Sequence, residues 1–600
     1  MAARFVSERN IRFTLHEVHQ AADLTAYPYF KEHSRKSFDM IIDAAMGLAK
    51  NLTRPIFQEM DRKPPELVDG AVRVHPQVRK IMKASGEGGW ISSIFPRDLD
   101  GEQLPWIITG AASHIFCAAN YSASVYPELT RGAANLIACF GSDAQKQTYL
   151  PKLLSGLWQG TMALTEPQAG SGLADIATAA YPVSEGLYRI KGEKVFISAG
   201  DHDGVDNVVH LLLARIDGSP SGVKGISLFI VPKRRIDAQG GLISNDVTVS
   251  QIFHKMGYRG CPITQLVFGE KGDCLGYRVG EPEKGLFYMF QMMNESRLGV
   301  GLAACSIATA AYHAALEYTR GRRQGRRPGD KDPKSPMVPI IEHADVKRML
   351  LFQRAVSEGA LSLIFYCFKL SDLIVADPSN KERYHLLLEL LTPIAKTYPS
   401  EMACLSVSQS LQCFGGYGYC DDFPVEQHYR DTRIHPIHEG TTGIQGMDIL
   451  GRKVTMANGK AFLLFTGEVK KSLKEASESG TLKNLSGKLE ASLTTLEQVT
   501  SALVQTAGEK GAERFLADAT LYLELISHVA IAWQWLLQAI SADRALKGPC
   551  SEADKNFYQG KLHTCRYFFG YELPKNLGFA ARLLDPDRVT VEMKPCYFTD

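Results

Sequence analysis

The chain has 600 residues, of which 45% are hydrophobic, 22% charged and 9% aromatic, an ordinary composition for a soluble globular protein. At about 150 residues per domain, this length predicts about four domains. The 67 Lys and Arg residues nearly balance the 65 Asp and Glu residues, so the formal net charge is +2. So small a charge argues against a broadly basic protein that binds nucleic acid.

The first residues, MAARFVSERNIRF, lack the apolar core of a signal peptide. No uninterrupted apolar run approaches the ~18 residues of a membrane span, and the best candidate, Val529–Ile540, contains Gln534 and Gln538. None of the twelve cysteines forms a C-x-x-C pair, so neither a zinc ribbon nor a disulfide framework is indicated. We therefore expect a cytoplasmic protein without integral membrane contact.

Five segments that differ in composition and in the spacing of apolar residues follow one another along the chain. They are an arm with scattered aromatic residues at 1–40, a helical domain at 41–160, a β domain at 161–285, a helical bundle at 286–455 and an additional helical domain at 456–600. Helices and strands do not alternate in this order, which disfavours a doubly wound parallel sheet. The sequence therefore predicts a mainly α fold with a β insert.

Periodicity places the individual elements. Apolar residues at helical spacing and small residues suited to close packing predict long helices at Trp106–Phe140, Met293–Arg320, Ala344–Ile374 and Lys381–Phe414. Short apolar runs between Gly, Pro, Asp and Asn are typical of a small antiparallel β domain. These runs are Leu187–Ile190, Lys194–Ser198, Asn207–Ile216, Gly225–Val231, Val247–Phe253 and Thr264–Phe268. The Gly-, Pro- and Arg-rich stretch Arg320–Pro339 is predicted to be an exposed loop.

The segment MALTEPQAGS, residues 162–171, lies where the helical texture gives way to strands, a junction at which ligands often bind. Thr165 offers a hydroxyl group, Gly170 lets a ligand approach the backbone closely, and Ser171 can donate to an anionic group. The same residue types are common in turns, so a purely structural turn stays open as an interpretation.

A second candidate site begins at QCFGGYGY, residues 412–419, whose glycines allow a ligand close to the backbone. Further on, Glu439 lies in a short, mostly uncharged segment just before a helix. Loss of water around this carboxylate raises its pKa and suits it to act as a general base. His435 and His438 precede it, but no further zinc- or iron-type ligands accompany them, so we expect no metal.

Two other patterns receive structural interpretations. Gly299–Ala304 fits the loose G-x-G-x-x-G/A fingerprint, but no strand precedes it, so its small residues predict close helix packing rather than a nicotinamide site. The basic run that begins at Arg320 is predicted to be mostly a solvated loop, in which one or two arginines can hold a diphosphate.

Seven segments in a fixed order resemble the acyl-CoA dehydrogenase family over roughly residues 41–455. They are MALTEPQAGS (162–171), KVFISAG (194–200), HKMGYRGCPITQLVF (254–268), NESRLGVG (294–301), RRQGR (322–326), QCFGGYGY (412–419) and IHEGTTGIQ within 434–445. The arm and the tail make the chain similar to the enlarged bacterial subgroup, which includes 3-methylmercaptopropionyl-CoA dehydrogenases and broad-range fatty acyl-CoA dehydrogenases. The resemblance implies an N-terminal helical domain, a middle antiparallel β domain, a C-terminal four-helix bundle and an extra C-terminal helical domain, with FAD between the β domain and the bundle.

The resemblance also implies roles for individual residues. Those that would bind FAD are Met162, Leu164, Thr165, Ser171, Phe196, Ser198, Arg322, Gln324, Gln412, Phe414, Gly415, Gly416, Thr441, Gly443 and Gln445. Those that would bind the acyl-CoA substrate are Ser171, Asn294, Arg297 and Gly440. By the same resemblance, Arg322, Gln324 and the segment Gln412–Gly416 would reach the FAD of a neighbouring subunit.

The implied reaction is the α,β-dehydrogenation of an acyl-CoA thioester to the trans-2-enoyl-CoA. Glu439 would remove the α proton and flavin N5 would accept the β hydride. Charge that develops on the thioester oxygen requires hydrogen-bond donors, which in the family are the backbone N–H of the catalytic Glu and a flavin ribityl hydroxyl. Electrons would pass to an electron-transfer flavoprotein. The surplus C-terminal domain would replace subunit contacts, which predicts a homodimer.

Two alternatives stay open. The first is an FAD-dependent acyl-CoA oxidase that uses oxygen, disfavoured because oxidases usually carry an H-G-T-type variant where this chain has Gln-Ala-Gly-Ser at 168–171. The second is a DNA-associated flavoprotein of the same fold, supported only by the basic run after Arg320. The chain also departs from the Trp, Thr, Asp and Asp that the family usually has at Phe196, Ser198, Asn294 and Gly172.

Overall fold

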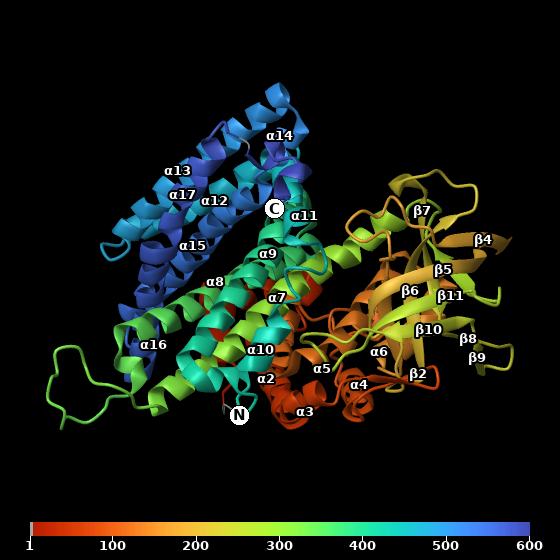
Figure 1. Cartoon of the computed structure of the whole chain (residues 1–600), viewed down its shortest axis with the longest axis horizontal. Coiled ribbons are helices and arrows are strands. Elements are labelled where there is room, and N and C mark those ends of the chain that lie inside the picture. The colour runs from red at the N-terminus through yellow and green to blue at the C-terminus, as the bar shows by residue number, and fades with distance from the viewer. Residues whose placement is uncertain (1–3, 588, 600) are drawn as a thin grey trace. The chain divides into compact units, whose positions relative to one another are not determined.

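The computed structural model describes residues 4–587 and 589–599. They form two compact units, which we call the bundle unit and the sheet unit (Figure 1). The bundle unit contains the residues up to Ile42, Trp106–His114 and the residues from Arg297 onward; the sheet unit contains Asp43–Pro105 and Ile115–Ser296. Each unit combines separate stretches of chain, so the five-segment division expected from the sequence stays a prediction.

Helices build the bundle unit. Its α-helices are α1 (Glu8–Arg12), α8 (Ala344–Ala376), α9 (Lys381–Phe414), α10 (Val425–Thr432), α11 (Thr442–Asp448), α12 (Lys460–Ser477), α13 (Lys483–Lys510), α14 (Ala512–Leu516), α15 (Ala519–Leu546), α16 (Glu552–Tyr567), α17 (Asn576–Leu584) and α18 (Val589–Glu592). Shorter 3-10 and π turns are η1 (Phe13–Val18), η2 (Ala21–Ala26), η3 (Pro28–Phe30), η8 (Ile340–Glu342), η9 (Pro378–Asn380), η10 (Gly415–Tyr419), η11 (Ile449–Lys453), η12 (Phe568–Glu572), η13 (Leu573–Lys575) and η14 (Pro595–Phe598).

Three helices contribute residues to both units: α2 (Arg35–Leu48), α5 (Trp106–Phe140) and α7 (Gly285–Gly321). The bounds of α5 and α9 are those that the spacing of apolar and small residues predicts. Helix α5 contains a kink, since Asn120 has a non-helical conformation with φ −164° and ψ 98°.

Close helix packing explains the small residues of α7. A Cβ atom built on Gly301 would lie only 2.0 Å from the carbonyl oxygen of Ala395 in α9, so a larger residue would separate the two backbones. The segment Gly299–Ala304 is helical and follows helical residues rather than a strand. The helical, packing interpretation is therefore confirmed for Gly301, whereas a Cβ atom on Gly299 would meet nothing within 4 Å.

The C-terminal domain docks on α8 through α15. This helix is apolar nearly all round, as expected for a helix buried on most sides, and Trp533 and Trp535 are almost fully buried. The Trp535 indole N–H donates to the Ala355 carbonyl oxygen at 2.9 Å. A Cβ atom on Gly359 would lie 2.6 Å from the same indole nitrogen, so α8 makes room for the ring.

Three helices in the described part of the chain, α7, α8 and α15, are long and apolar enough to cross a membrane by length and composition alone. The sequence excludes only uninterrupted apolar runs of membrane-spanning length, and these helices pass the test of length and mean hydropathy although polar residues interrupt them. In the most apolar 18-residue windows of these helices, 89%, 67% and 89% of the residues are buried inside the protein. Packing thus accounts for most of their apolar character.

The sheet unit contains an eight-stranded sheet (Figure 1). The strands run in the order β10-β11-β5-β12-β7-β6-β3, and β4 pairs with both β5 and β6. Their bounds are β3 (Trp158–Ala163), β4 (Ala179–Ser184), β5 (Leu187–Ser198), β6 (Asn207–Ile216), β7 (Ile226–Pro232), β10 (Val247–Ile252), β11 (Ile263–Phe268) and β12 (Leu275–Val279).

The other elements of the sheet unit are short. Two-stranded ribbons join β1 (Glu66–Val68) to β2 (Ala71–Arg73) and β8 (Arg234–Ile236) to β9 (Leu242–Ser244). Helices of this unit are α3 (Phe57–Arg62), α4 (Gln77–Glu87) and α6 (Asp143–Leu154), with turns η4 (Ala49–Thr53), η5 (Arg54–Ile56), η6 (Arg97–Leu99) and η7 (Val223–Gly225).

The sheet is antiparallel except where β6 pairs in parallel with β3 and with β4. Parallel pairing needs a long crossover between the strands. The chain between β3 and β6 provides it and contains β4 and β5. The sequence pattern does not predict strands β3 and β4, for different reasons. Strand β3 is buried at most positions and shows no alternation, while β4 contains Pro182 and is mostly exposed.

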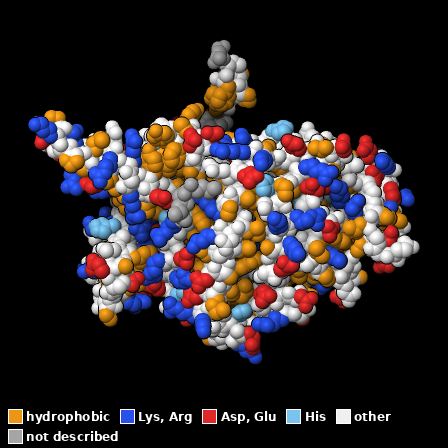
Figure 2. All heavy atoms as spheres, turned by 90° about the horizontal axis from the view of Figure 1, so that it is seen from below, with side chains coloured by type: hydrophobic (Ala, Val, Ile, Leu, Met, Phe, Trp, Pro, Cys, Tyr) orange, Lys and Arg blue, Asp and Glu red, His pale blue; other side chains and the backbone are white. Residues whose placement is uncertain are grey.

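Charges on the surface are mixed in sign. On the face shown in Figure 2, Lys and Arg side chains are interspersed with Asp and Glu. In the Arg320–Pro339 loop, arginines fold back onto the loop itself: Arg323 donates to the Met337 carbonyl oxygen at 2.9 Å, and Arg326 donates to that of Ser335 at 2.7 Å. Part of the basic run therefore shapes its own loop.

Candidate active site

Glu439 lies in the bundle unit, in the short loop between α10 and α11. Its backbone is left-handed, with φ +52°, and Gly440 follows with φ +86°. For a residue with a side chain, this conformation costs roughly 1–2 kcal/mol, and such strain is often found at functional sites. The φ of Gly440 favours glycine, and a Cβ atom there would lie 2.1 Å from Nε2 of Gln445 and would displace that amide.

Hydrogen bonds from both sides hold this loop. At the start of α11, the Thr441 hydroxyl accepts from the Ile444 N–H at 3.4 Å, which is N-cap geometry. The Thr442 N–H donates to the Pro436 carbonyl oxygen at 3.2 Å, and the Thr442 hydroxyl donates to the Glu401 carboxylate of α9. The conformation of Glu439 is therefore fixed by its neighbours on the loop, α9 and α11.

The Glu439 carboxylate is isolated from hydrogen-bond donors. Its Oε2 atom is buried and has no hydrogen-bond partner within the described chain. Burial raises the pKa of the carboxyl group to about 7, although the positive charges of Arg297 and Lys396 oppose the shift. A carboxyl group with this pKa is partly ionised at neutral pH and can still accept a proton readily.

Lys396 of α9 is fully buried. Its ammonium group donates to the His435 carbonyl oxygen at 2.8 Å and therefore binds the backbone of the segment that leads to Glu439. Burial lowers the pKa of Lys396 to about 8, an effect opposed by the carboxylates of Glu401 and Glu439.

His435 and His438 pack against each other, with ring centroids 5.4 Å apart and planes nearly perpendicular. Burial lowers the pKa of His435 to about 4 and that of His438 well below its ordinary value, so both rings are neutral near pH 7. Within residues 4–587 and 589–599, no cluster of three or more His, Cys, Asp or Glu side chains has the arrangement of a metal site.

Arg297, expected to touch CoA, is buried beside the loop of Glu439. Its Nη1 atom lies 4.0 Å from Oδ2 of Asp448 in α11. A Cβ atom on Gly440 would lie 3.8 Å from the Arg297 Nε atom. The structure thus brings Arg297, Gly440 and Gln445 together around Glu439. Asn294 and Ser171 belong to the sheet unit, where Asn294 is half-buried and Ser171 exposed.

The sheet unit holds the remaining candidates of the first motif. Met162 lies on β3, and Leu164 and Thr165 follow it in the loop after that strand. The Thr165 carbonyl oxygen accepts from the Val195 N–H at 2.9 Å, so this loop lies beside β5. Ser198, at the end of β5, is half-buried.

Phe196, near the end of β5, has a large apolar side chain that is exposed to solvent. It has a left-handed backbone, with φ +59°, and 62% of its surface is exposed. Its ring packs against Phe253 with centroids 4.8 Å apart. A large exposed aromatic ring on a fixed strand suits contact with a flat apolar ligand.

A buried ion pair that the sequence did not reveal holds the loop after β3. The Lys194 ammonium donates to the Glu166 carboxylate at 2.8 Å and to the Leu164 carbonyl oxygen at 2.9 Å. Glu166 also accepts from the N–H groups of Ala177 and Thr178, at 2.6 and 3.0 Å. Burial alone raises the pKa of Glu166, but Lys194 and these donors outweigh it and lower the pKa below its ordinary value.

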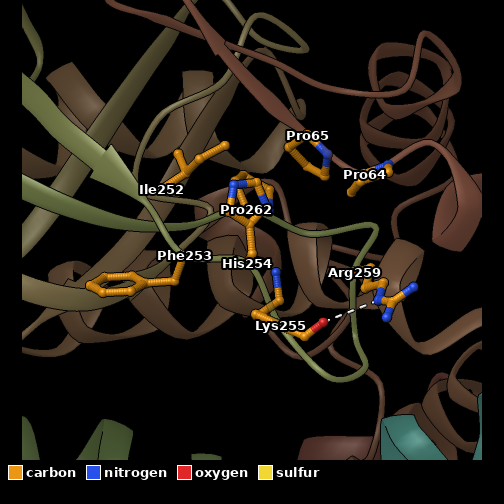
Figure 3. A pocket seen from close by; sticks show the side chains of 8 residues that line it. All are labelled: Pro64, Pro65, Ile252, Phe253, His254, Lys255, Arg259 and Pro262. Atoms are coloured by element: carbon orange, nitrogen blue, oxygen red, sulfur yellow. Dashed lines mark hydrogen bonds between the residues drawn. The ribbon is translucent and has the colours of Figure 1, made fainter.

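Phe253 also borders a cavity of the sheet unit, of about 230 Å³ (Figure 3). The other residues that line it are Pro64, Pro65, Ile252, His254, Lys255, Arg259 and Pro262. Two of its basic side chains are engaged with the loop itself: Lys255 donates to the Cys261 carbonyl oxygen at 2.8 Å, and the Arg259 Nε–H donates to that of Lys255 at 3.1 Å. The basic residues therefore shape the wall of the cavity.

The remaining candidates lie in the bundle unit. Arg322, Gln324 and Gln412 are exposed, whereas the Phe414 ring is buried and stacked on Tyr318 with centroids 4.2 Å apart. The Phe414 ring is thus not available to a ligand. Cβ atoms built on Gly415, Gly416 and Gly443 would meet nothing within 4 Å, so the backbone at these positions faces open space.

Each unit, taken by itself, has features that fit a part of a flavin nucleotide. Both polar atoms of the Gln445 side chain are buried and without hydrogen-bond partners in the described chain. Buried polar groups are nearly always paired, so a polar ligand would satisfy this amide. In the bundle unit, the open space over the glycine backbone gives a diphosphate room to approach closely. In the sheet unit, Phe196 with Ser198 offers an apolar surface beside a hydroxyl group, as a flavin ring with a polar chain requires.

Domain models of one family match four consecutive parts of the chain. The acyl-CoA dehydrogenase N-terminal domain matches residues 36–157, the middle domain 161–270 and the C-terminal domain 283–454. A fourth model, described as acetyl-CoA dehydrogenase C-terminal like, matches residues 465–594. These matches confirm the predicted fold class.

Individual proteins resemble nearly the whole chain. It is 35% identical over 565 residues to the 3-methylmercaptopropionyl-CoA dehydrogenase of Ruegeria pomeroyi, covering 93% of this chain and 94% of the relative. It is 33% identical over 605 residues to a butyryl-CoA dehydrogenase of Syntrophomonas wolfei, covering 98% and 97%. The solved structure of an acyl-CoA dehydrogenase of Bacillus anthracis complexed with FAD superposes with a TM-score of 0.73 at 20% identity, over 95% of this chain and 92% of that one.

Proposed function

Because this chain belongs to the acyl-CoA dehydrogenase family, we propose that it converts an acyl-CoA thioester to the trans-2-enoyl-CoA, with Glu439 as the base. The chain is an FAD-dependent enzyme, in keeping with its family and with the structural relative that contains FAD. One observation carries the assignment of the base: the buried Glu439 Oε2 atom has no hydrogen-bond partner among the described residues.

The chemistry of the α carbon defines what Glu439 must do. The α C–H bond is a weak acid, so the base must be desolvated and unpaired, and the thioester oxygen must receive a hydrogen bond as charge develops on it. The Glu439 N–H makes no hydrogen bond within the described chain, and we assign it to that oxygen. FAD, when bound, supplies N5 as the acceptor of the β hydride.

We assign the ligand contacts by unit. In the sheet unit, Met162, Leu164, Thr165, Phe196 and Ser198 would contact the flavin ring and its chain, and Ser171 and Asn294 would contact the CoA moiety. In the bundle unit, the FAD contacts would be Arg322, Gln324, Gln412, the backbone of Phe414–Gly416, Thr441, Gly443 and Gln445. The open glycine backbone and the unpaired Gln445 amide support these assignments. Arg297, beside Gly440, would act on the loop of Glu439 in addition to any contact with CoA.

We further propose an electron-transfer flavoprotein as the electron acceptor, a homodimer as the assembly and the cytoplasm as the location. The twelve cysteines are all free thiols, which supports a reducing compartment. The domain formed by α12–α17 covers α8 and α9 of the bundle, which supports its role as a substitute for contacts between subunits.

Anaerobic titration of the purified holoenzyme with acyl-CoAs of different length, branching and ring content tests this function. Loss of the oxidised-flavin absorbance with at least one of them is expected, together with one enoyl-CoA formed per flavin reduced. Absence of bleaching with every acyl-CoA would contradict the proposal. Stoichiometric hydrogen peroxide at the full turnover rate, with oxygen as sole acceptor, would replace the dehydrogenase by an oxidase.

A further inference from the structure

Lys396 is a buried cation to which the proposed reaction gives no direct role. It stands alone among the uncharged residues Leu390–Ser400 of α9, and its side chain is fully buried. Removing an ammonium group from water is costly unless partners compensate for the lost hydration. Its hydrogen bond to the His435 carbonyl oxygen, at 2.8 Å, provides one partner, and the carboxylates of Glu401 and Glu439 provide opposite charge.

The geometry of this contact separates two effects. The ammonium group donates to the backbone and not to the Glu439 carboxylate, whose Oε2 atom has no hydrogen-bond partner in the described part of the chain. A direct ion pair would stabilise Glu439 as an anion and make it a poor base. A cation held nearby by a backbone carbonyl group still favours the ionised carboxylate, while leaving its oxygen open to a proton.

Other charged and titratable groups face the same place. Helix α7 contributes Arg297, and α11 contributes Asp448, 4.0 Å from that arginine. Helix α9 contributes Glu401, which accepts from Thr442, and the loop contributes His435 and His438. Glu524 of α15 interacts with Glu401. The neutral histidines add no charge near pH 7, so the cations beside Glu439 are Lys396 and Arg297.

We propose that Lys396 is a positioning residue for Glu439: its ammonium group fixes the backbone of the segment that carries the base and supplies a nearby positive charge that favours the ionised carboxylate. This inference rests on the proposed function, in which Glu439 accepts the α proton. Lys396 itself touches neither substrate nor cofactor in this account.

The Lys396→Met variant removes the charge and keeps the length of the side chain. In the holoenzyme, the second-order rate of flavin bleaching by subsaturating acyl-CoA should rise with pH in both proteins, since the base must be ionised. The rising limb should move to higher pH by about one unit or more in the variant, as expected when a neighbouring cation is lost. A rising limb that coincides with that of the wild type would overturn the proposal.

Lys453→Met is the matched control. Lys453 is also a buried lysine of the bundle unit, and it pairs with Glu389 instead of the active-site loop. Its loss should leave the pH profile in place even if stability falls. An equal shift in this control would show that the effect comes from any lost buried charge, and the proposal would fail.

Two further variants keep the test decisive if Lys396→Met does not fold. Lys396→Arg keeps the charge and should keep the wild-type position of the rising limb. Lys396→Gln removes the charge and keeps a neutral polar group on the side of the His435 carbonyl oxygen, so it should show the alkaline shift. The opposite pattern, a shift in Lys396→Arg and none in Lys396→Gln, would contradict the role of the charge.

A double-mutant cycle gives a readout that does not depend on turnover. The drop in melting temperature caused by Lys396→Met is measured in the wild-type and Glu439→Gln backgrounds, both as holoenzymes. At about pH 7.5 the drop should be larger in the wild type, because Glu439 with a pKa of about 7 and Lys396 with a pKa of about 8 are both mostly charged there; at about pH 5 the difference should vanish. Equal drops at about pH 7.5 would overturn the inference even if acyl-CoAs bleach the flavin. Coupling in a protein that no acyl-CoA bleaches would leave the electrostatic contact standing and remove the proposed function.

Discussion

Two glutamates of this protein, the buried Glu166 and the half-buried Glu439, each lie near a fully buried lysine, and their pKa values shift in opposite directions. In the sheet unit, Glu166 receives hydrogen bonds from Lys194 and from two backbone N–H groups, and its pKa is lowered. In the bundle unit, Glu439 receives none at its buried oxygen, because Lys396 donates to a carbonyl group, and burial raises its pKa to about 7.

The difference shows that a nearby lysine is not by itself enough to lower the pKa of a desolvated carboxylate. Lys194 contacts the Glu166 carboxylate directly, and its charge, together with the hydrogen bonds from Lys194 and the two N–H groups, outweighs the effect of burial. Lys396 donates to a backbone carbonyl group instead, and its charge does not outweigh the effect of burial on Glu439. Glu166 is satisfied and serves the architecture of the loop that carries Leu164 and Thr165. Glu439 is left unsatisfied, on a strained backbone, and is thereby available for chemistry.

The largest effect is expected from Glu439→Gln. The amide cannot accept the α proton, so the rate of flavin bleaching by acyl-CoA should fall roughly 10³-fold or more, near the upper range for loss of a general base. FAD content and acyl-CoA affinity should stay close to those of the wild type. Stopped-flow absorbance measures the rate, and bleaching at the wild-type rate would mean that another residue is the base.

Glu166→Gln should act on stability. It leaves the Lys194 ammonium buried without its anion, which typically costs about 3–5 kcal/mol. We expect a lower free energy of unfolding and weaker retention of FAD, measured by chemical denaturation and by flavin released on dilution. The double variant Glu166→Gln/Lys194→Met should recover part of the loss. Wild-type stability in the single variant would show that the pair does not hold this loop.

Glu166→Gln is expected to lower the stability of the fold, whereas Glu439→Gln is expected to raise it, by a smaller amount. The folded-state pKa of Glu439 lies above its ordinary value of 4.5, at about 7, so folding favours the protonated form. The stability that this group contributes is thus lost as pH rises from about 4.5 to about 7, by at most about 3.5 kcal/mol at about 1.4 kcal/mol per pKa unit. Glu439→Gln should therefore melt at a higher temperature than the wild type at pH 8 and at a similar temperature at pH 5. A variant that is less stable than the wild type at pH 8 would show that the carboxylate is satisfied.

The sequence reveals the two regions unequally. Long helices such as α5 and α9 follow from the spacing of apolar and small residues, because each buries a continuous face. Strands β3 and β4 do not follow, since β3 is buried at most positions and β4 contains Pro182. Glu439 was predicted from its uncharged surroundings and its motif.

The partners of these glutamates could not be predicted with the same ease. Lys194 and Glu166 are far apart in the sequence, and only the pairing of the loop with β5 brings them together. Lys396 carries a weak signal, as a single charge in the uncharged run Leu390–Ser400, but its acceptor is a backbone atom that no pattern of side chains reveals. Arg297 was assigned to CoA by resemblance, and its burial beside Gly440 depends on tertiary packing.

The pH dependence of flavin reduction tests the central claim, that Glu439 is an unsatisfied carboxylate poised as a base. The second-order rate of bleaching of the wild-type holoenzyme by subsaturating acyl-CoA reports the ionisation of the free enzyme. It should rise about tenfold per pH unit at low pH and level off with an apparent pKa near 7, because burial raises the pKa of Glu439 to about 7. A rate that is constant from about pH 5 to about pH 9, or that levels off near the ordinary pKa of a glutamate, would contradict the account.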